Sequence, residues 1–586
     1  MTLGSRVRGV ALLVVVALLA LSGCVQVPTS GPVKKVPGQA EVCQNCINVE
    51  VAPPAPGAEP GEVVEGYLRA MFNYQPGYTT AKQFLTGAAA AAWRPGDGVS
   101  IYRGGPEVDG DNVQLVGRRV GMVGKDRTYT VQDTRFSWDF RLVQENGQWR
   151  ISNAPEGLLV AEYAFRRFYT AYSTYFVGYN GTLVPERIYL PALRNPDNIA
   201  SALMTALLAG PSKWLGRAAK SEIPMGTSLS LDSVTISNGI AEVPLNETIL
   251  GAADPQRGLM AAQIVYTLRQ VSAVKGVLIT VNEQKYRLPG ADQTSLVLPM
   301  DAVSREIDPV PLVDNQLYAV QDRRVFRVTT PTGTPELQAL DGPLGKPRRY
   351  PVDSLAVSVK GTDLAAVTDG GKALRRSTTT TESDFTTLAE GLTELLRPQF
   401  TRYGEVWAVG RQGGRQRFWV SGSGLADNTV VSSVFEDGKV TAFRISPDGA
   451  RMALVRQTRT GQELGMVRIV RAEGVAVEGW KTIDVTQSEL PQLAQITDVA
   501  WLDANELLVL GTPSRDAPPT AVRITTDASR ITEEGGAPPE WNARELTVLS
   551  RPQTVVVIGR DGRTWRRDGG QWVSFLPGVT TLAYAG

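Results

Sequence analysis

The residues with the clearest chemical potential in this chain of 586 residues are its three cysteines, Cys24, Cys43 and Cys46. A thiolate can accept a lipid, ligate a metal or form a disulfide. Cys24 follows Leu21-Ser22-Gly23, and an aliphatic residue, two small residues and then cysteine are the pattern of a bacterial lipobox. We expect its sulfur to carry diacylglycerol and, after cleavage before it, its new amino group to carry an acyl chain such as palmitate.

The segment before Cys24 has the organisation of a signal peptide. Arg6 and Arg8 supply positive charge, and twelve consecutive apolar residues follow from Val10 to Leu21. A run of this length is too short to cross the hydrocarbon core, which needs about 20 residues. The sequence therefore predicts a lipoprotein signal peptide over residues 1–23. It also predicts a mature protein held by lipid at the extracytoplasmic face of the cell membrane.

Cys43 and Cys46 form a C-x-x-C pair within a proline-rich tether over residues 24–60. A zinc site would need two further Cys or His ligands, and the sequence has none to offer. A thioredoxin-like site would sit where a strand meets a helix, whereas this pair lies in the tether. We expect either a local disulfide, which is favoured outside the cytoplasm, or two free thiols, and no metal.

The chain contains no histidine, which excludes Ser-His-Asp and Cys-His catalysis and every imidazole metal ligand. We expect no catalytic residue, no metal and no cofactor. An enzyme built on paired carboxylates needs no histidine and stays an alternative, although no pair stands out among the 59 acidic residues. Removal of residues 1–23 changes the formal charge from +1 to −1, and a near-neutral protein argues against nucleic acid as a partner.

Residues 61–165 are expected to form an α+β domain. Val64, Tyr67, Leu68 and Met71 fall at helical spacing, and apolar residues alternate with polar ones from 136 to 142, as in a strand. Asn146-Gly147 is the strongest short signal for a hairpin turn. Helices followed by a curved antiparallel sheet resemble the cone-shaped nuclear-transport-factor-like fold.

Residues 172–295 are expected to form a second α+β domain. An apolar helical face from Ala200 to Leu208 is ended by Gly210-Pro211, and a second amphipathic helix is predicted over 259–274. Asn238-Gly239 predicts a hairpin turn, and the apolar run 277–281 is typical of a central strand.

Residues 311–586 are expected to form an all-β propeller. Strand–turn–strand units recur at a spacing of roughly 45 residues, which fits six or seven blades of four strands. In Ser446-Pro447-Asp448-Gly449 we expect the aspartate to cap a turn rather than to do chemistry. Because Pro309 and Pro311 lack amide donors, we expect few hydrogen bonds to cross this boundary and each side to fold alone.

Five phrases in order resemble a GerMN domain: ALLAGPS (206–212), IPMGTSL (223–229), GIAEVPLN (239–246), QIVYTLRQV (263–271) and VKGVLITVN (274–282). Together with the lipobox and the propeller-like repeats, the whole chain resembles the actinobacterial LpqB lipoprotein family. The resemblance implies a regulatory or scaffold role for a membrane partner, the sensor kinase MtrB of the MtrAB two-component system, in envelope and cell-division signalling. GerMN domains bring no established catalytic residues with them.

Beside the enzyme built on paired carboxylates, two readings of the function compete. In the first, the chain is a lipid-anchored scaffold that docks a membrane partner from outside the cytoplasm. In the second, it is a structural lipoprotein that binds cell-wall glycan or peptide, which exposed aromatic residues on one face of the propeller would favour. In both, we expect the GerMN-containing half to lie nearer the membrane, since the lipid and the tether precede it.

Overall fold

The computed structural model describes residues 52–586 except for 331–332, 347–349, 381–384, 423–429, 473, 486–492, 515 and 535–540. Cys24, Cys43 and Cys46 lie outside the described residues, as do the predicted signal peptide and most of the tether. Within the described part of the chain, no helix is both long and apolar enough to cross a membrane.

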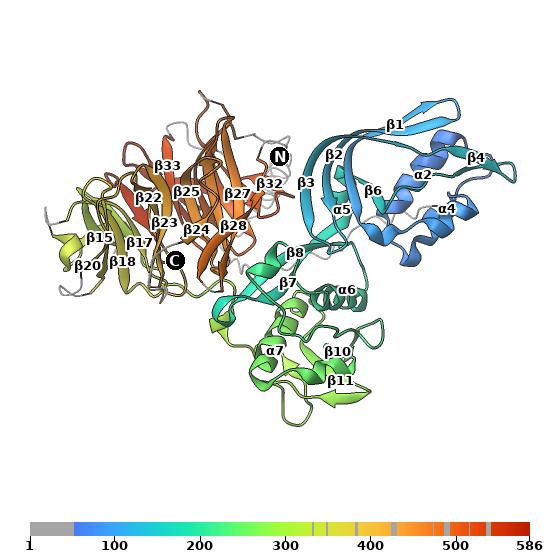
Figure 1. The fold of residues 1–586 in the computed structure, drawn as a ribbon, viewed down its shortest axis with the longest axis horizontal. Coiled ribbons are helices and arrows are strands. Elements are labelled where there is room, and N and C mark those ends of the chain that lie inside the picture. Colours follow the sequence, from blue (N-terminus) through green and yellow to red (C-terminus); the bar gives the residue numbers. More distant parts are fainter. Residues whose placement is uncertain are drawn as a thin grey trace, which may run out of the picture. The chain divides into compact units, whose positions relative to one another are not determined.

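The first domain places short helices against a curved sheet (Figure 1). Its helices are α2 (Pro60–Phe72), α3 (Thr79–Lys82), α4 (Gly87–Ala92) and α5 (Glu162–Phe168). Its main sheet has the order β3 (Tyr129–Asp139), β2 (Asn112–Val123), β1 (Val99–Asp109) and β6 (Leu158–Ala161). The four apolar residues at helical spacing lie on α2 and are all buried, as their spacing predicts.

The predicted hairpin of this domain is confirmed. Asn146 and Gly147 join β4 (Leu142–Glu145) to β5 (Gln148–Ile151), with φ angles of 55° and 70°. Positive φ at both central residues is what a type I′ turn requires, and asparagine and glycine adopt it at low cost.

A two-stranded antiparallel ribbon, β7 (Tyr169–Val177) and β8 (Leu183–Pro191), leads into the GerMN-like domain. That domain contains α6 (Pro196–Leu208) and α7 (Asp254–Leu268). Its sheet runs in the order β12 (Gln284–Tyr286), β11 (Gly276–Val281), β10 (Ile240–Leu245) and β9 (Thr235–Ser237), with β13 (Leu298–Pro299) also paired to β11. Asn238 and Gly239 turn between β9 and β10 as predicted, with φ angles of 52° and 81°.

Helix α7 is displaced from the predicted range of 259–274. It begins at Asp254, where Pro255 occupies the first turn, and it ends at Leu268. Proline is favoured in the first turn because its missing amide has no helical partner there. Val271 and Val274 are buried after the helix has ended, so the apolar spacing continues although the helix does not.

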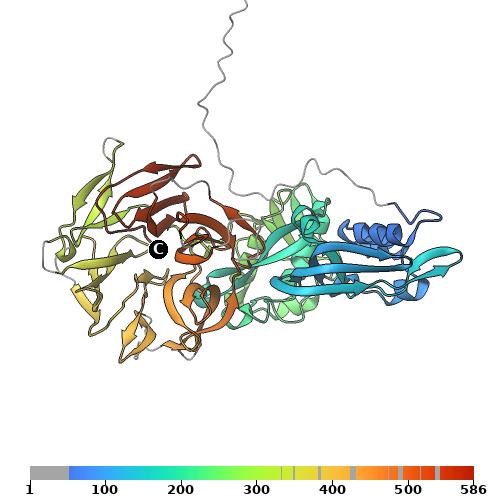
Figure 2. The same ribbon diagram turned by 90° about the horizontal axis from the view of Figure 1, so that it is seen from above.

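The remaining described strands form six sheets around an axis, which Figure 2 shows nearly end-on. The first sheet contains β14 (Tyr318–Gln321), β15 (Arg324–Thr329), β16 (Glu336–Ala339) and β37 (Thr581–Ala583). The second contains β17 (Val352–Val357), β18 (Asp363–Thr368), β19 (Ala373–Thr378) and β20 (Phe385–Ala389), and the third β21 (Gln399–Phe400), β22 (Val406–Gln412) and β23 (Arg415–Ser421).

The fourth sheet contains β24 (Val430–Ser432), β25 (Lys439–Ile445), β26 (Arg451–Gln457), β27 (Gln462–Arg471) and β28 (Val475–Thr482). The fifth contains β29 (Gln495–Trp501), β30 (Glu506–Thr512), β31 (Thr520–Thr525) and β32 (Ile531–Glu533). The sixth contains β33 (Ala543–Leu549), β34 (Thr554–Gly559), β35 (Thr564–Asp568) and β36 (Gln571–Ser574). Buried apolar side chains fill the spaces between neighbouring sheets.

The ring is closed by strands from the two ends of this domain. β37 pairs antiparallel with β14, with Tyr318 opposite Ala583 and Val320 opposite Thr581. The first sheet thus joins the start of the domain to its last strand, and the described residues form a six-bladed propeller.

The aspartate of the Ser446–Gly449 turn caps the turn, as predicted. Asp448 is fully buried, and its carboxylate accepts hydrogen bonds from the Ser446 hydroxyl at 2.6 Å and from the Ala450 amide at 2.9 Å. It also forms an ion pair with Arg451 at 2.5 Å. The Asp448 carboxylate therefore stabilises this turn within the fourth sheet.

The prediction that few hydrogen bonds cross the boundary before the propeller is wrong. Asp308 is only 9% exposed, and its carboxylate binds Arg551 of the sixth blade and the hydroxyl of Tyr266 on α7, each at 3.3 Å. Arg402 donates to the carbonyl oxygens of Glu306 and Asp308, both at 2.5 Å. The two prolines donate no amide hydrogen bond, as expected. The Asp308 carboxylate and the carbonyl groups of Glu306 and Asp308 instead accept the hydrogen bonds that connect this boundary to α7 and the propeller.

Candidate functional site

Strand β8 packs against two domains at once, because successive side chains of a strand point to opposite faces. Val184, Ile188 and Leu190 are buried in the core of the GerMN-like domain. Tyr189 points the other way, into the core of the first domain, where its ring packs at a tilt against those of Tyr129 and Phe165. One strand therefore fixes both domains.

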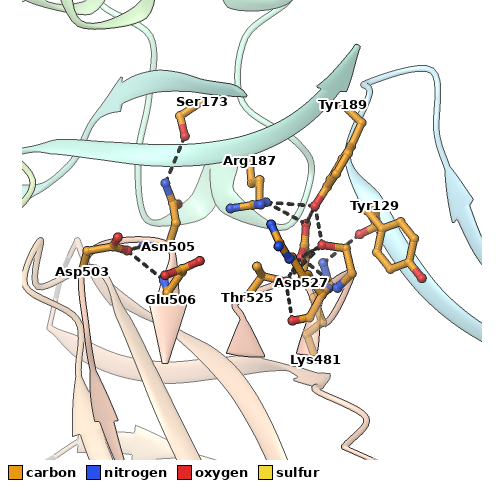
Figure 3. Close-up of polar contacts among 12 residues, drawn as sticks. Tyr129, Ser173, Arg187, Tyr189, Lys481, Asp503, Asn505, Glu506, Thr525 and Asp527 are labelled. Atoms are coloured by element: carbon orange, nitrogen blue, oxygen red, sulfur yellow. Dashed lines mark hydrogen bonds and ion pairs between the residues drawn. The ribbon is translucent and has the colours of Figure 1, made fainter. Parts of the chain in front are cut away.

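Arg187 and Tyr189 on this second face of β8 also reach the propeller (Figure 3). The Tyr189 hydroxyl donates to Asp527 Oδ2 at 2.9 Å and accepts from Arg187 Nε at 2.9 Å. Arg187 Nε lies 3.7 Å from Asp527 Oδ2, with the two side chains 19% and 8% exposed. This buried charge pair joins β8 to the turn that follows β31.

The electrostatics of this pair favour the charged forms. Burial alone would raise the pKa of Asp527, but Arg187 and the hydrogen bonds from Ser529 and Thr525 outweigh it and hold that pKa below its usual value. For Arg187, burial lowers the pKa, while Tyr189 and Asp527 raise it further than burial lowers it. Burial and the nearby Asp527 raise the pKa of the Tyr189 hydroxyl, which keeps it protonated as a donor.

Further hydrogen bonds connect the propeller to both preceding domains. Lys481 Nζ donates to the Tyr129 carbonyl at 3.4 Å, and Asn505 Nδ2 donates to Ser173 Oγ at 3.0 Å (Figure 3). Trp214 donates from its indole to the Gly479 carbonyl at 2.6 Å, and its own carbonyl accepts from Arg468 at 2.6 Å. The three domains consequently meet in one continuous polar interface.

A cleft of about 920 Å³ opens beside this interface. The first domain contributes the β2–β3 turn, residues 124–130, and the GerMN-like domain contributes residues 185–187 and 209–215 with Thr205 and Ala206. The propeller contributes Arg451, Met466, Trp480, Lys481, Thr526 and Asp527. This volume lies near the upper end of the range for ligand sites, about 300–1,000 Å³.

The conformation of the turn that forms one wall of the cleft is fixed by hydrogen bonds within the turn. Asp126 Oδ1 accepts from the amide and the hydroxyl of Thr128 at 3.0 and 2.8 Å. Arg127 has a φ of 64°, and its carbonyl accepts the Tyr189 amide at 2.9 Å. The turn is thereby fixed to β8, and Arg127 is among the residues that line the cleft.

The cleft carries an excess of positive charge, with six basic and three acidic side chains in its walls. Arg187, Arg451 and Lys125 have carboxylate partners, respectively Asp527, Asp448 and Asp97. Among the residues that the structure describes, Arg127, Lys213 and Lys481 form no ion pair. Lys481 nevertheless lies close enough to Glu186 for its charge to oppose the rise in that carboxyl group's pKa.

The acidic side chains of the cleft are already engaged. Glu186 accepts hydrogen bonds from the amide of Ser212, at 2.8 Å, and from its hydroxyl. Burial raises the Glu186 pKa, and the Ser212 hydrogen bonds oppose this without reversing it. Asp126 is bound within its own turn and Asp527 is bound to Arg187, so neither is free to neutralise the three cations.

None of the residues singled out by the sequence for chemistry lies in this cleft. Cys24, Cys43 and Cys46 are outside the described residues. Within the described ranges, no group of three or more Cys, Asp or Glu side chains is arranged to hold a metal. The sequence reasoning missed the cleft because its walls come from three domains; charged Glu186 and Arg187 in an otherwise apolar strand were the local signal.

The fold defines the chain as a three-domain protein with a cone-like domain, a GerMN-like domain and a propeller. Family models match in the same order: the LpqB N-terminal domain over 53–166, a sporulation and spore germination domain over 173–287, and the LpqB beta-propeller domain over 329–583. The chain is 30% identical to Lipoprotein LpqB of Cutibacterium acnes over 592 residues, covering 97% of each. It is 26% identical to that of Streptomyces coelicolor over 530 residues, covering 84% of each.

The chain therefore belongs to the LpqB family of membrane-associated lipoproteins. Among solved structures, the first GerMN domain of the sporulation protein GerM from Bacillus subtilis is similar to part of it. The match has 21% identity and a TM-score of 0.17, and it covers 20% of this chain and 89% of that one.

Proposed function

We propose that this lipoprotein is an extracytoplasmic, lipid-anchored scaffold that binds a membrane partner in the cleft between its three domains. The proposal includes removal of residues 1–23 as a signal peptide and lipidation of Cys24. The observation that carries it is the cleft itself, about 920 Å³ in volume, with six basic and three acidic residues in its walls. Binding, rather than catalysis, is the activity that such a site supports.

The buried contacts behind the cleft support its role as a binding surface. Asp527, Tyr189 and Arg187 join the walls to one another, so the cleft is shaped before any partner arrives. A binding surface that needs no ordering on association avoids part of the entropic cost of binding. A scaffold that holds a partner at the membrane gains from such preorganisation.

The sensor kinase MtrB of the MtrAB system is the partner that we propose, because the family resemblance implies it. In this proposal the lipoprotein contributes to envelope and cell-division signalling by contacting the extracytoplasmic part of the kinase. The lipid on Cys24 holds both proteins at one membrane surface, which raises their effective concentration.

Filling the cleft tests the proposal in the full-length, anchored protein. Ala209 lines the cleft and is exposed, so Ala209→Trp adds bulk there without entering a core. Gln284→Trp places the same bulk on an exposed position of β12 that does not line the cleft. Co-purification of MtrB from mild detergent should be lost with Ala209→Trp and kept with Gln284→Trp.

Two results would count against the proposal. Equal co-purification by both variants would move the binding site elsewhere on the protein. If the unaltered protein captures another membrane protein and no MtrB, that membrane protein would take the place of the kinase as the partner.

A further inference from the structure

We propose that the propeller binds a small carboxylate, of about the size of acetate, in a cavity at one end of its central channel. The cavity is separate from the cleft between the domains, so the inference does not depend on the proposed function. Three observations lead to it: the enclosure and size of the cavity, the hydrogen-bond donors in its wall, and one arginine there without a carboxylate partner.

The first observation is the enclosure. The wall contains residues of β21, β25, β29 and β33 and the residues directly after β37. Each of these strands is the last in its sheet and lies near the axis that Figure 2 shows nearly end-on. The segment before the propeller covers this end of the channel, because Val310, Pro311 and Val313 line the cavity and Val310 is buried. A ligand there would be largely removed from bulk water.

The size of the cavity limits the ligand. Its volume is about 90 Å³. A cavity of about 150 Å³ holds one benzene molecule, whereas about 10–15 Å³ is enough for one water. The cavity is thus larger than a single water requires and fits a molecule of the size of acetate.

The second observation is the set of donors. Gln399 lines the cavity and is 8% exposed. Its Oε1 accepts the Ile445 amide at 2.9 Å, while its Nε2 has no acceptor among the described residues. The Ser550 hydroxyl, also in the wall, has no hydrogen-bond partner in the described part of the chain. Because a buried donor without an acceptor costs free energy, a ligand that brings acceptors would be stabilised here.

The third observation is the charge of the wall. Three arginines line the cavity, whereas no aspartate or glutamate of the described ranges does. Arg397 pairs with Glu545 at 2.9 Å and Arg444 pairs with Asp498 at 2.8 Å, so two of the three are neutralised from behind the wall. Burial nevertheless lowers the pKa of Arg444, and the attraction of Asp498 does not restore it. A further negative charge nearby would favour the charged guanidinium.

The third arginine, Arg402, has no carboxylate partner. It donates to the carbonyl oxygens of Glu306 and Asp308, and it forms no ion pair with any residue that the structure describes. The Asp308 carboxylate is bound instead by Arg551 and Tyr266. The α-carboxylate of Gly586 also belongs to this wall, and no described basic side chain pairs with it. One arginine is therefore left for a ligand that carries a single negative charge.

The apolar part of the wall favours a carboxylate over other anions. Phe400, Ile445, Trp501 and Val548 line the cavity beside the polar groups. A small carboxylate presents two acceptor oxygens to the donors and a hydrocarbon group to these side chains. Inorganic sulfate carries two charges and no apolar part, so it matches neither the single free arginine nor the apolar side.

The test uses the full-length lipoprotein in detergent and fluoroacetate as the probe, with binding followed by the fluorine resonance in NMR. We expect saturable broadening of the fluoroacetate signal. Fluoroacetamide has nearly the same size without the charge and should not bind measurably. Equal binding of fluoroacetamide, or fluoroacetate broadening that does not saturate, would overturn the proposal.

Variants of Arg402 separate its charge from its contacts with the covering segment. Arg402→Gln should weaken fluoroacetate binding at least about tenfold, because a hydrogen bond to a charged group typically contributes that much. Arg402→Lys keeps the charge but cannot hold both carbonyl groups in the same way, and it should retain most of the binding. Equal loss in both variants would overturn the proposal, since Arg402 would then act only by holding the segment in place.

A matched control removes a charge from the same blade. Arg415 on β23 is exposed and does not line the cavity, so Arg415→Gln should bind fluoroacetate within about twofold of the unaltered protein. Weakening equal to that of Arg402→Gln would show that net charge explains the binding and would overturn the proposal.

Two further variants locate the binding within the cavity. Ala500 lines it and is buried, so Ala500→Leu fills part of the space and should abolish binding, with thermal unfolding as the check that the protein is folded. Ser550→Ala removes a hydroxyl that has no partner in the described protein, so it keeps the fold and should weaken binding about threefold. Unchanged fluoroacetate binding in folded Ala500→Leu, or in Ser550→Ala if Ala500→Leu does not fold, would overturn the proposal.

Discussion

Replacing Asp527 by alanine should loosen the contact between the propeller and the two domains before it. The Asp527 side chain is 8% exposed and accepts hydrogen bonds from Tyr189, Ser529 and Thr525 while facing Arg187. Removal leaves a buried arginine without its carboxylate and a buried tyrosine hydroxyl without its acceptor. Breaking a buried ion pair costs about 3–5 kcal/mol, and the 19% exposure of Arg187 places this one at the lower end, about 3 kcal/mol.

Hydrogen exchange of the Tyr189 backbone amide measures this effect at the residue whose hydroxyl donates to Asp527. That amide donates to the Arg127 carbonyl at 2.9 Å, so it reports the contact between β8 and the β2–β3 turn beside the cleft. A loss of about 3 kcal/mol corresponds to exchange roughly 100-fold faster, if the amide exchanges through opening of the junction.

An exposed ion pair provides the control. Asp133 pairs with Arg118 in the same domain, and their side chains are 49% and 48% exposed. Asp133→Ala should cost less than about 1 kcal/mol and leave the exchange of the Tyr189 amide unchanged. If Asp527→Ala also left that exchange unchanged, the buried pair would not hold the junction and the reasoning would be refuted.

The remaining predictions concern the lipid anchor, the cysteine pair of the tether, the pH dependence of the contact at Asp527, and the segment that precedes the propeller. Cys24→Ala should leave a protein that is neither cleaved nor acylated, as mass spectrometry would show, and a normally acylated product would contradict the assignment. Replacing both Cys43 and Cys46 by serine should hardly change thermal unfolding of the folded domains, and stoichiometric zinc in the purified protein would contradict the expected metal-free pair. The folded-state pKa of Asp527 lies below its usual 3.8, so the stabilisation it gives is complete above that pH and is lost as the pH falls through the folded-state pKa. The protection of the Tyr189 amide, which is its exchange rate relative to that of an unstructured amide at the same pH, should therefore fall in acid, and Asp527→Asn should remove this dependence. Limited proteolysis should spare residues 305–311 and cut there in Asp308→Ala, because Asp308 holds both Tyr266 and Arg551; cleavage of the unaltered protein at this segment would contradict the docked linker.

Local signals in the sequence predicted the features that depend on local conformation. Asn146-Gly147 and Asn238-Gly239 turn as their positive φ angles require, and Asp448 caps its turn. The number of blades stayed open between six and seven because the first sheet takes its fourth strand, β37, from the far end of the chain. No local pattern shows which strand completes a ring.

The cleft and the domain contacts could not be predicted for the same reason. Arg127, Lys213 and Lys481 are ordinary basic residues in three separate segments, and only the packing of three domains brings them to one cavity. The boundary before the propeller contains two prolines, which suggested a loose linker. The contacts of Asp308 come from side chains on α7 and the sixth blade, which the linker's own sequence does not reveal.

The central claim is that the cleft is where the membrane partner binds, and crosslinking in living cells tests it most directly. A photoreactive residue at Ala209, which is exposed in the cleft, should capture MtrB, while the same residue at Gln284 on β12 should not. Crosslinks to MtrB from Gln284 and from other positions outside the cleft, with none from Ala209, would contradict the account.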